Sequence, residues 1–287
     1  MRWEDERLSD NVQDDRGLSF GGGGGPLMIG GGGLGALVLV GLALVFGVDP
    51  RLLLQGGGEG GAPVQTGAAP GQRADDEDAR FSRAVLAFTE DTWGRVFQDR
   101  GANYEPPTLV LYDEGHPTGC GFGQSAMGPF YCPNDQKVYL DLSFWQELGG
   151  RFGATGDAAK AYVIAHEIGH HVQHLLGADQ QARRMGAEGA ESGSVRLELQ
   201  ADCYAGVWAA HAAEVSGGEV ALEPTDVEDG LRAAAAVGDD TLQRKATGRI
   251  APDSFTHGSS AQRVRWFRQG VQTGDPSSCD TFNTSRL

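Results

Sequence analysis

Residues 166–170 read His-Glu-Ile-Gly-His, and this spacing restricts how the chain can fold around them. In an α-helix, His166 and His170 lie one turn apart on the same face, where both imidazoles can bind one metal ion. Glu167 then lies beside the open coordination position of that metal. Imidazole pairs of this kind are typical ligands of Zn²⁺, which also needs a third protein ligand. The fold must therefore bring a second element against this helix.

We predict the third ligand on a later helix. One common extension of the motif places a histidine six residues after the second one, but Leu176 occupies that position. Glu198 and Asp202 are four residues apart, so a helix would present both carboxylates on one face. Glu198 is predicted to bind the metal, and Asp202 to accept a hydrogen bond from the other N–H of a ligand imidazole. Glu188 and Glu191 are alternative ligands, although the neighbouring glycines would hold them poorly.

A zinc site with an adjacent glutamate is suited to hydrolysis. Zinc polarises a carbonyl group and acidifies water, and Glu167 would be the general base that accepts the proton. His257 precedes a predicted helix and is the best candidate for stabilising a tetrahedral oxyanion, with Tyr204 as a second candidate. The predicted catalytic residues are therefore Glu167 and His257.

The other histidines are predicted to have different roles. His171 and His174 lie on the same predicted helix but away from the stripe formed by the two ligands, so we expect packing or supporting roles for them. His116 and His211 are predicted to be surface residues.

The apolar pattern predicts an α+β fold, mostly helical, with a small β-sheet at the front. A strand over 108–112 and a hairpin from 126–131 and 137–142 form the sheet, and its glycine-rich part, 121–131, could present an edge strand to an extended peptide. An ordinary sheet edge explains that segment equally well. Residues 178–192 read as a polar loop or a short helix. The predicted helices cover about 79–98, 158–176, 195–213, 225–237 and 260–272.

Composition changes along the chain predict four parts. Residues 1–25 are expected to be a disordered cytoplasmic tail, 26–48 a transmembrane helix, 49–78 a flexible linker and 79–287 the zinc-binding domain. The formal net charge of −16 argues against nucleic acid as a partner, because a phosphate backbone needs a clustered basic surface.

The transmembrane prediction depends on an apolar run over 27–48. As a helix, this run would span roughly 30 Å, the thickness of the hydrocarbon core. A cleaved signal peptide and a buried helix are the alternatives, but the preceding segment is long and acidic and the run is rich in glycine. Three arginines before the run and two soon after it give a small bias toward a cytoplasmic N-terminus.

All four cysteines follow the apolar run, which favours an oxidising compartment for the domain. Three disulfide pairings are possible. We favour Cys120 with Cys132, which bracket one loop, and Cys203 with Cys279, which would tie the C-terminal segment to the helix that carries Asp202. A second zinc site is the alternative, but the chain has no C-x-x-C motif to support it.

Several strings resemble a bacterial family of neutral zinc metallopeptidases. They are 128–133 (Gly-Pro-Phe-Tyr-Cys-Pro), 136–142 (Gln-Lys-Val-Tyr-Leu-Asp-Leu), 166–173, 197–203 (Leu-Glu-Leu-Gln-Ala-Asp-Cys) and 262–267, together with 1–4 and 11–16 near the N-terminus. The resemblance covers nearly the whole chain apart from the variable linker. It implies a membrane-anchored layout and supplies a class of activity more than a substrate.

The H-E-x-x-H motif followed by E-x-x-x-D is also similar to the gluzincin pattern of thermolysin-like peptidases. That similarity implies zinc ligands at His166, His170 and Glu198, a base at Glu167 and, for Asp202, a hydrogen bond to His166 rather than to His170. The interval between His170 and Glu198 is particular to this chain. The Tyr and His that stabilise the oxyanion in thermolysin-like peptidases cannot be mapped here by motif.

We therefore expect a membrane-anchored, extracytoplasmic metallopeptidase with one Zn²⁺ per chain, acting on proteins or peptides. The anchor would be a single pass with the N-terminus in the cytoplasm, and the sequence does not determine an oligomeric state. Two alternatives stay open: a non-catalytic binding or scaffold module stabilised by zinc, and a zinc hydrolase of a non-peptide amide such as a cell-wall linkage. An intact Glu167 argues against the first, because a structural zinc site needs no general base.

Overall fold

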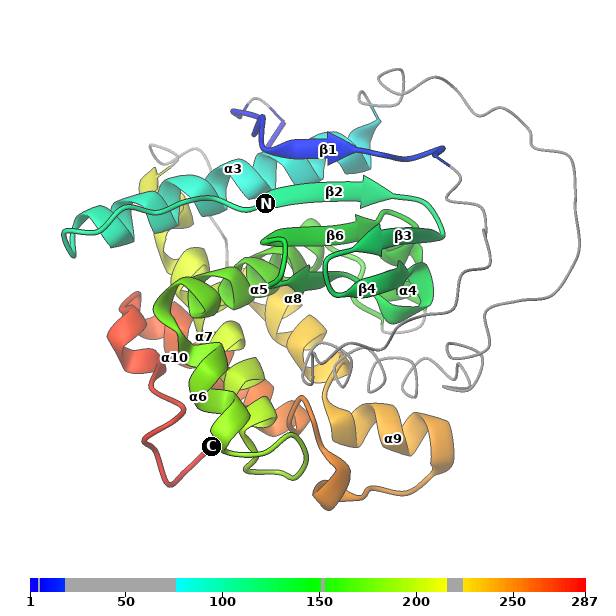
Figure 1. The fold of residues 1–287 in the computed structure, drawn as a ribbon, viewed down its shortest axis with the longest axis vertical. Helices are drawn as coiled ribbons and strands as arrows, with labels where there is room; N and C mark the ends of the chain where they lie inside the picture. Colours follow the sequence, from blue (N-terminus) through cyan, green and yellow to red (C-terminus); the bar gives the residue numbers. More distant parts are fainter. Residues whose placement is uncertain (5, 19–75, 151–152, 216–223) are drawn as a thin grey trace, which may run out of the picture.

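The structure, a computed structural model, describes residues 1–4, 6–18, 76–150, 153–215 and 224–287. A small sheet lies along one side of the molecule, and helices pack behind and below it (Figure 1). The domain is α+β and mostly helical, as predicted. The described α-helices are α3 (Glu77–Gln98), α4 (Phe144–Gly150), α5 (Asp157–Leu176), α6 (Ala178–Arg184), α7 (Gly193–Val215), α8 (Pro224–Ala236), α9 (Asp239–Thr247) and α10 (Ser260–Thr273).

The main sheet has four strands in the order β1–β2–β6–β5. Strands β1, β2 and β6 are parallel to one another, and β5 is antiparallel to β6, so β5 lies at one edge. A separate antiparallel hairpin pairs β3 with β4. The strand bounds are β1 (Val12–Asp14), β2 (Thr108–Tyr112), β3 (Gly115–Thr118), β4 (Gly121–Gln124), β5 (Phe130–Cys132) and β6 (Lys137–Asp141).

Strand β2 divides its side chains between two buried clusters, as the period of two along a strand requires. Leu109 and Leu111 join the large core shared with the helices, whereas Val110 and Tyr112 belong to a second cluster. The His116 ring of the β3–β4 hairpin lies against Tyr112 in that second cluster and is 7% exposed. The prediction that His116 is a surface residue is therefore wrong, because the hairpin folds over this side of the sheet.

The predicted disordered tail over 1–25 is wrong for the residues that the structure describes there, 1–4 and 6–18. Strand β1 pairs in parallel with β2, Val12 being opposite Leu109. Trp3 is 5% exposed, and its ring packs edge-on against Phe81 of α3. An apolar ring in a closed core outweighs the polar composition that suggested disorder.

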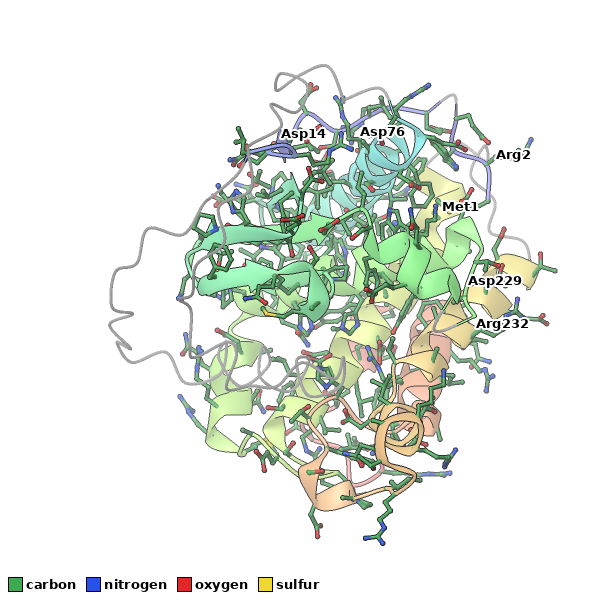
Figure 2. All side chains as sticks on the ribbon, turned by 90° about the vertical axis from the view of Figure 1, so that its right-hand side faces the viewer. Met1, Arg2, Asp14, Asp76, Asp229 and Arg232 are labelled. Carbon is green, nitrogen blue, oxygen red and sulfur yellow. A yellow bond between two sulfur atoms is a disulfide. The ribbon has the colours of Figure 1, made fainter. Side chains whose placement is uncertain are left out.

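Polar side chains also fix this N-terminal segment to the domain. Arg16 is bonded to Asp14 of β1 and to Asp76, which caps the start of α3. Asp14 and Asp76 both lie at the top of the molecule in the view of Figure 2. Ser9 and Asn11 donate hydrogen bonds to Glu90 of α3 at 2.6 and 2.8 Å. The N-terminal residues are thus an integral part of the same domain as the residues from Asp76 onward.

Most predicted elements are present close to their expected positions. The helix over 158–176, the strand over 108–112 and the 178–192 short helix are confirmed as α5, β2 and α6. The predicted hairpin is confirmed as β5–β6, although its first strand is restricted to Phe130–Cys132. The fold also contains elements that the sequence pattern did not predict: β1, the β3–β4 hairpin, α4 and α9.

The predicted membrane span at 26–48 and most of the linker at 49–78 lie outside the described residues. Among the helices that the structure does describe, none has both the length and the apolarity needed to cross a bilayer.

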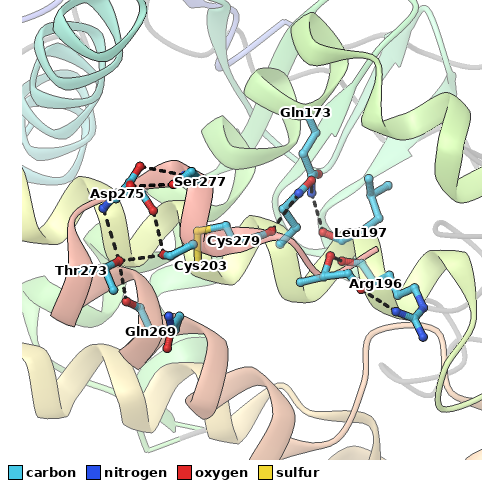
Figure 3. The surroundings of a disulfide bond; sticks show 12 residues. Gln173, Arg196, Leu197, Cys203, Gln269, Thr273, Asp275, Ser277 and Cys279 are labelled. Atoms are coloured by element: carbon cyan, nitrogen blue, oxygen red, sulfur yellow. Dashed lines mark hydrogen bonds between the residues drawn. A yellow bond between two sulfur atoms is a disulfide. The ribbon is translucent and has the colours of Figure 1, made fainter. Parts of the chain in front are cut away.

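Both favoured disulfides are present, Cys120–Cys132 and Cys203–Cys279. The first joins the loop after the β3 strand to the edge strand β5. The second attaches the C-terminal segment to α7, close to Gln173 of α5 (Figure 3). Further bonds tie the same two parts together: Thr281 donates to the Arg196 carbonyl at 2.7 Å, and Gln200 to the Cys279 carbonyl at 2.9 Å.

Candidate metal centre

Helix α5 carries the two histidines on a rigid element, because most of its side chains are buried in the domain. Ile164, Ile168 and Val172 are buried in the large core. The helix ends where Gly177 adopts the left-handed conformation with φ of 75°, and the Gly177 N–H bonds back to the last turn. His166 and His170 are held one turn apart on this rigid element.

Helix α7 brings the third candidate ligand to these histidines. The His166 Nε2 atom lies 3.2 Å from Glu198 Oε2, and the His170 Nε2 atom lies 3.5 Å from Glu198 Oε1. Nitrogen and oxygen ligands about 2.0–2.1 Å from a tetrahedral Zn²⁺ are separated from one another by about 3.3 Å. One potential ligand atom from each of the three residues lies within 4.8 Å of the others. The donor set and its spacing therefore fit one Zn²⁺.

The ring of His166 is oriented by a buried polar group. Its Nδ1 atom lies 3.0 Å from Asp202 Oδ1, which leaves Nε2 directed at the cluster. Asp202 is fully buried and also accepts hydrogen bonds from Tyr162 and Arg263. Burial lowers the pKa of His166, but hydrogen bonds to Asp202 and Glu198 outweigh it and raise that pKa to about 9 in the metal-free chain.

The ring of His170 is oriented by an amide in place of a carboxylate. Its Nδ1 atom lies 2.8 Å from Gln173 Oε1. Gln173 in turn donates to the Leu197 carbonyl at 2.6 Å (Figure 3). It also donates to Gln200 at 3.1 Å. Because an amide oxygen only accepts, His170 carries its proton on Nδ1 and offers the Nε2 lone pair. Gln173 was not among the predicted site residues, although its position three residues after His170 was a usable signal.

Glu167 and Glu198 differ in their electrostatic surroundings. Burial raises the pKa of Glu167 above its ordinary value. For Glu198, burial also favours the protonated form, but the nearby His170 and His257 outweigh it and hold the pKa well below the usual range. The two carboxyl groups therefore have opposite pKa shifts within one site.

These groups face one pocket of about 190 Å³. Its polar lining includes His166, Glu167, His170 and Glu198, and its apolar wall includes Met127, Phe130, Val163 and Leu197. Tyr131 of the edge strand β5 also lines it. The cluster is thus accessible to a molecule that enters between the sheet edge and helix α5.

His257 lines the same pocket from the loop before α10. Its Nδ1 atom lies 3.3 Å from Asp239 Oδ1, and Asp239 Oδ2 accepts the backbone N–H groups of three consecutive loop residues: Thr256, His257 and Gly258. Burial lowers the pKa of His257, but the charges of Glu198 and Asp239 outweigh it and raise the pKa. Asp239, missed from the sequence, fixes this histidine and leaves Nε2 as the ring nitrogen available to the pocket.

The remaining candidates are held elsewhere. Tyr204 packs edge-on against Trp93 and lines a different depression beside Cys279, so it does not share the pocket of the cluster. His171 is buried between Tyr131 and the Glu105 carbonyl, and His211 is bonded to the Gly274 carbonyl. The rival ligand Glu191 is exposed.

The site has the features of H-E-x-x-H metal sites with a downstream E-x-x-x-D. Two histidines on one helix flank Glu167, and a glutamate from a second helix completes the cluster. The model of the family described as "Putative neutral zinc metallopeptidase" matches residues 1–282, and the chain belongs to this family. The family assignment predicted from the sequence is therefore confirmed.

Two relatives show how much of the chain is shared. The chain is 47% identical to "Uncharacterized protein YpfJ" of Escherichia coli K12 over 99% of its own length and 100% of that protein. It is 46% identical to "Uncharacterized protein Mb2605" of Mycobacterium bovis over 85% of its own length and 86% of that protein. No solved structure matches it significantly.

Proposed function

We propose that this protein is a zinc-dependent peptidase that hydrolyses peptide bonds at the His166–His170–Glu198 cluster. The observation that carries the proposal is the pocket in which these three ligands and Glu167 converge, with each imidazole oriented by its own hydrogen-bond partner. Zinc, when bound, would supply a Lewis acid that polarises the scissile carbonyl and acidifies water. One Zn²⁺ per chain is expected.

The protein side chains would move the protons. Glu167 would take a proton from the attacking water and pass it to the leaving amine. Asp202 and Gln173 would keep the two imidazoles in the tautomers that present Nε2. His257, held by Asp239, would donate a hydrogen bond to the oxygen that becomes negatively charged in the tetrahedral intermediate.

The substrate is proposed to be a protein or peptide in extended form. Strand β5 is at the edge of the sheet and contributes Phe130 and Tyr131 to the pocket. An extended peptide can add to such an edge through backbone hydrogen bonds. The apolar wall of Met127, Phe130, Val163 and Leu197 would favour an apolar side chain next to the scissile bond.

The test combines metal analysis with cleavage of a peptide library. Glu167→Gln should keep one zinc per chain and lower turnover by about 10²–10⁴-fold. Glu198→Ala should lower the zinc content well below one per chain, whereas Glu191→Ala, the exposed alternative ligand, should not. Zinc binding without peptide cleavage by the wild type would favour the scaffold alternative. Cleavage of a cell-wall amide but of no peptide would favour the non-peptide hydrolase.

We also propose that the domain works outside the cytoplasm. The support is the pair of disulfides, since such bonds persist in oxidising compartments. Attachment to the membrane through 26–48 stays a prediction, but a single pass there would separate strand β1 from strand β2, and these two strands are paired. Thiol counting on protein denatured without reductant should find few free cysteines, and four free thiols would contradict this placement.

A further inference from the structure

His171 directly follows the H-E-x-x-H motif and the candidate ligand His170, but its side chain connects two other parts of the fold. Its Nε2 atom lies 2.7 Å from the Glu105 carbonyl, and its Nδ1 atom lies 3.0 Å from the Tyr131 hydroxyl. A carbonyl oxygen only accepts, so Nε2 carries the proton and donates. The other nitrogen is then the acceptor, and the Tyr131 hydroxyl donates to it.

This geometry gives His171 a fixed position between the metal helix and the sheet. The side chain is fully buried, and Tyr104 packs edge-on against its ring. Glu105 belongs to the loop that leads into β2, and Tyr131 is the middle residue of the edge strand β5. One imidazole on α5 thus contacts both the entry to the sheet and its edge.

We propose that His171 is a positioning residue that acts through Tyr131. It fixes the distance between the edge strand β5 and the metal cluster, so that a peptide bound along β5 reaches the cluster. The inference rests on the proposed peptidase function and deepens it. The alignment of the substrate along β5 would depend on the hydrogen bond between Tyr131 and His171. Tyr131 has the geometry for this role because it lines the pocket and its hydroxyl is bonded to His171. The neighbouring residues Phe130 and Cys132 belong to the second buried cluster on the other side of the sheet, and Phe130 also reaches the pocket wall.

The main variant is Tyr131→Phe, which removes one hydroxyl and keeps the ring. With a quenched peptide of eight residues we expect KM to rise about 5–10-fold, the effect of one lost hydrogen bond, with kcat within about twofold. A short substrate that reaches little beyond the scissile bond should keep its KM. Zinc content should stay at one per chain, and the amide protons of β5 should exchange faster.

Two further variants separate positioning from general packing. His171→Gln retains an N–H donor for Glu105 and an oxygen acceptor for Tyr131, so its KM should lie nearer the wild type than that of His171→Leu. Tyr139→Phe is the matched control. Tyr139 lies on the neighbouring strand β6, and its hydroxyl is bonded to Asp135 and not to His171. The substitution should leave KM unchanged.

The wild-type residue and Tyr131→Phe can also be compared in a Glu167→Gln background. Fluorescence anisotropy then measures peptide affinity, which does not depend on turnover. Weaker binding after Tyr131→Phe supports the inference. An unchanged KM and affinity in Tyr131→Phe, with wild-type cleavage intact, overturns the positioning role alone. A wild type that neither binds nor cleaves peptides overturns both this inference and the proposed function.

A second inference comes independently from the N-terminal strand. Residues 12–14 pair with β2, the strand that follows α3 in the domain, and Trp3 is buried against α3. Two strands that are hydrogen-bonded to each other cannot lie on opposite sides of a bilayer. We infer that residues 1–18 and the domain from Asp76 onward lie on the same side of the membrane, in contrast to the predicted cytoplasmic N-terminus with an external domain.

Single cysteines can test this in the full-length protein in cells. Asp10 and Gln272 are exposed on the N-terminal segment and on α10, and the four native cysteines are paired in disulfides. A membrane-impermeant maleimide should label Asp10→Cys and Gln272→Cys alike, both before permeabilisation or both only after it. Labelling of one position from outside and of the other only after permeabilisation would overturn the inference. The unsubstituted protein measures background labelling.

Discussion

Arg263 donates two hydrogen bonds to Asp202, from Nε to Oδ2 at 2.8 Å and from Nη2 to Oδ1 at 2.9 Å. The pair links α10 to α7, and both side chains are buried. Because Asp202 also lies 3.0 Å from the His166 Nδ1 atom, a cation on α10 supports an imidazole on α5. Burial favours the neutral form of Asp202, but the charge of Arg263 outweighs it and lowers the pKa.

Replacement of Arg263 should therefore weaken metal binding. In Arg263→Gln the buried Asp202 loses its cation, which typically costs about 3–5 kcal/mol in the free energy of unfolding. We expect the zinc dissociation constant to rise about 10–100-fold, as for other residues that orient metal ligands. Competition with a chromophoric chelator measures the affinity, and urea titration measures the stability. Arg268→Gln, an exposed change on the same helix, is the control, and an equal effect there would contradict the assignment.

Close contact between two glycines sets the spacing of these helices. A Cβ atom on Gly206 of α7 would collide with the Phe267 carbonyl of α10, and one on Gly270 would collide with the Cys203 carbonyl. Both obstacles are backbone atoms, which cannot rotate away. The approach of α7 to α10 that allows Arg263 to reach Asp202 thus depends on the absence of side chains at both positions.

Gly206→Ala and Gly270→Ala should each destabilise the fold by about 1–3 kcal/mol or more, the usual cost of overpacking. Gly94→Ala is a control of opposite sign. Apart from the backbone of its own helix and its chain neighbours, no atom of the described residues lies within 4 Å of a Cβ placed on Gly94 in the interior of α3. Alanine should therefore stabilise by about 0.5–1 kcal/mol. Thermal or urea unfolding of the three variants checks the signs, and a neutral Gly270→Ala would show that the helices can separate without loss.

The local part of the site could be predicted from the sequence, and its long-range part could not. His166, Glu167 and His170 are fixed by a four-residue spacing on one helix, and Glu198 with Asp202 by the same spacing on another. Arg263 and Asp239 carry no such spacing, because they approach the site only through the packing of α10 and α9. Their contacts with Asp202 and His257 join residues 61 and 18 positions apart.

Strand β1 shows a second limit of sequence analysis. Three residues beside a glycine-rich segment have no apolar pattern of their own, and their role depends on pairing with β2 almost a hundred positions later. The β3–β4 hairpin was missed for a similar reason, since glycine and proline suggest loops until His116 is seen packed on Tyr112.

The pair Asp239–His257 predicts a pH-dependent stability in the zinc-free protein. Burial raises the pKa of Asp239, but its bonds with His257 outweigh this and lower the pKa, so its contribution is lost as the pH falls below about 4. The raised pKa of His257 gives a contribution present below about pH 6.5 and lost as the pH rises through the folded-state value.

The stability difference between wild type and Asp239→Asn should therefore be largest between about pH 4 and 6.5 and decrease on both sides. Its maximum should be about 1–3 kcal/mol, since the substitution also weakens bonds to three loop amides. Urea unfolding across the pH range in the presence of a chelator measures it. A difference that stays constant with pH would show that the pair is not ionic.

The two disulfides should contribute unequally to stability, because they close loops of different length. Their cysteines are 12 and 76 positions apart. The loss of chain entropy on closure corresponds to about 3 kcal/mol for the shorter loop and about 4.5 kcal/mol for the longer one. Paired alanine substitutions, Cys120/Cys132 against Cys203/Cys279, should follow this order in urea unfolding.

The Cys203–Cys279 disulfide should also affect zinc binding. It holds the Cys279 carbonyl beside Gln200, which accepts a hydrogen bond from Gln173, so its removal should weaken zinc binding. Removal of the Cys120–Cys132 bond should leave the zinc affinity unchanged, and a loss of zinc in that variant alone would contradict the path from the C-terminal segment to His170.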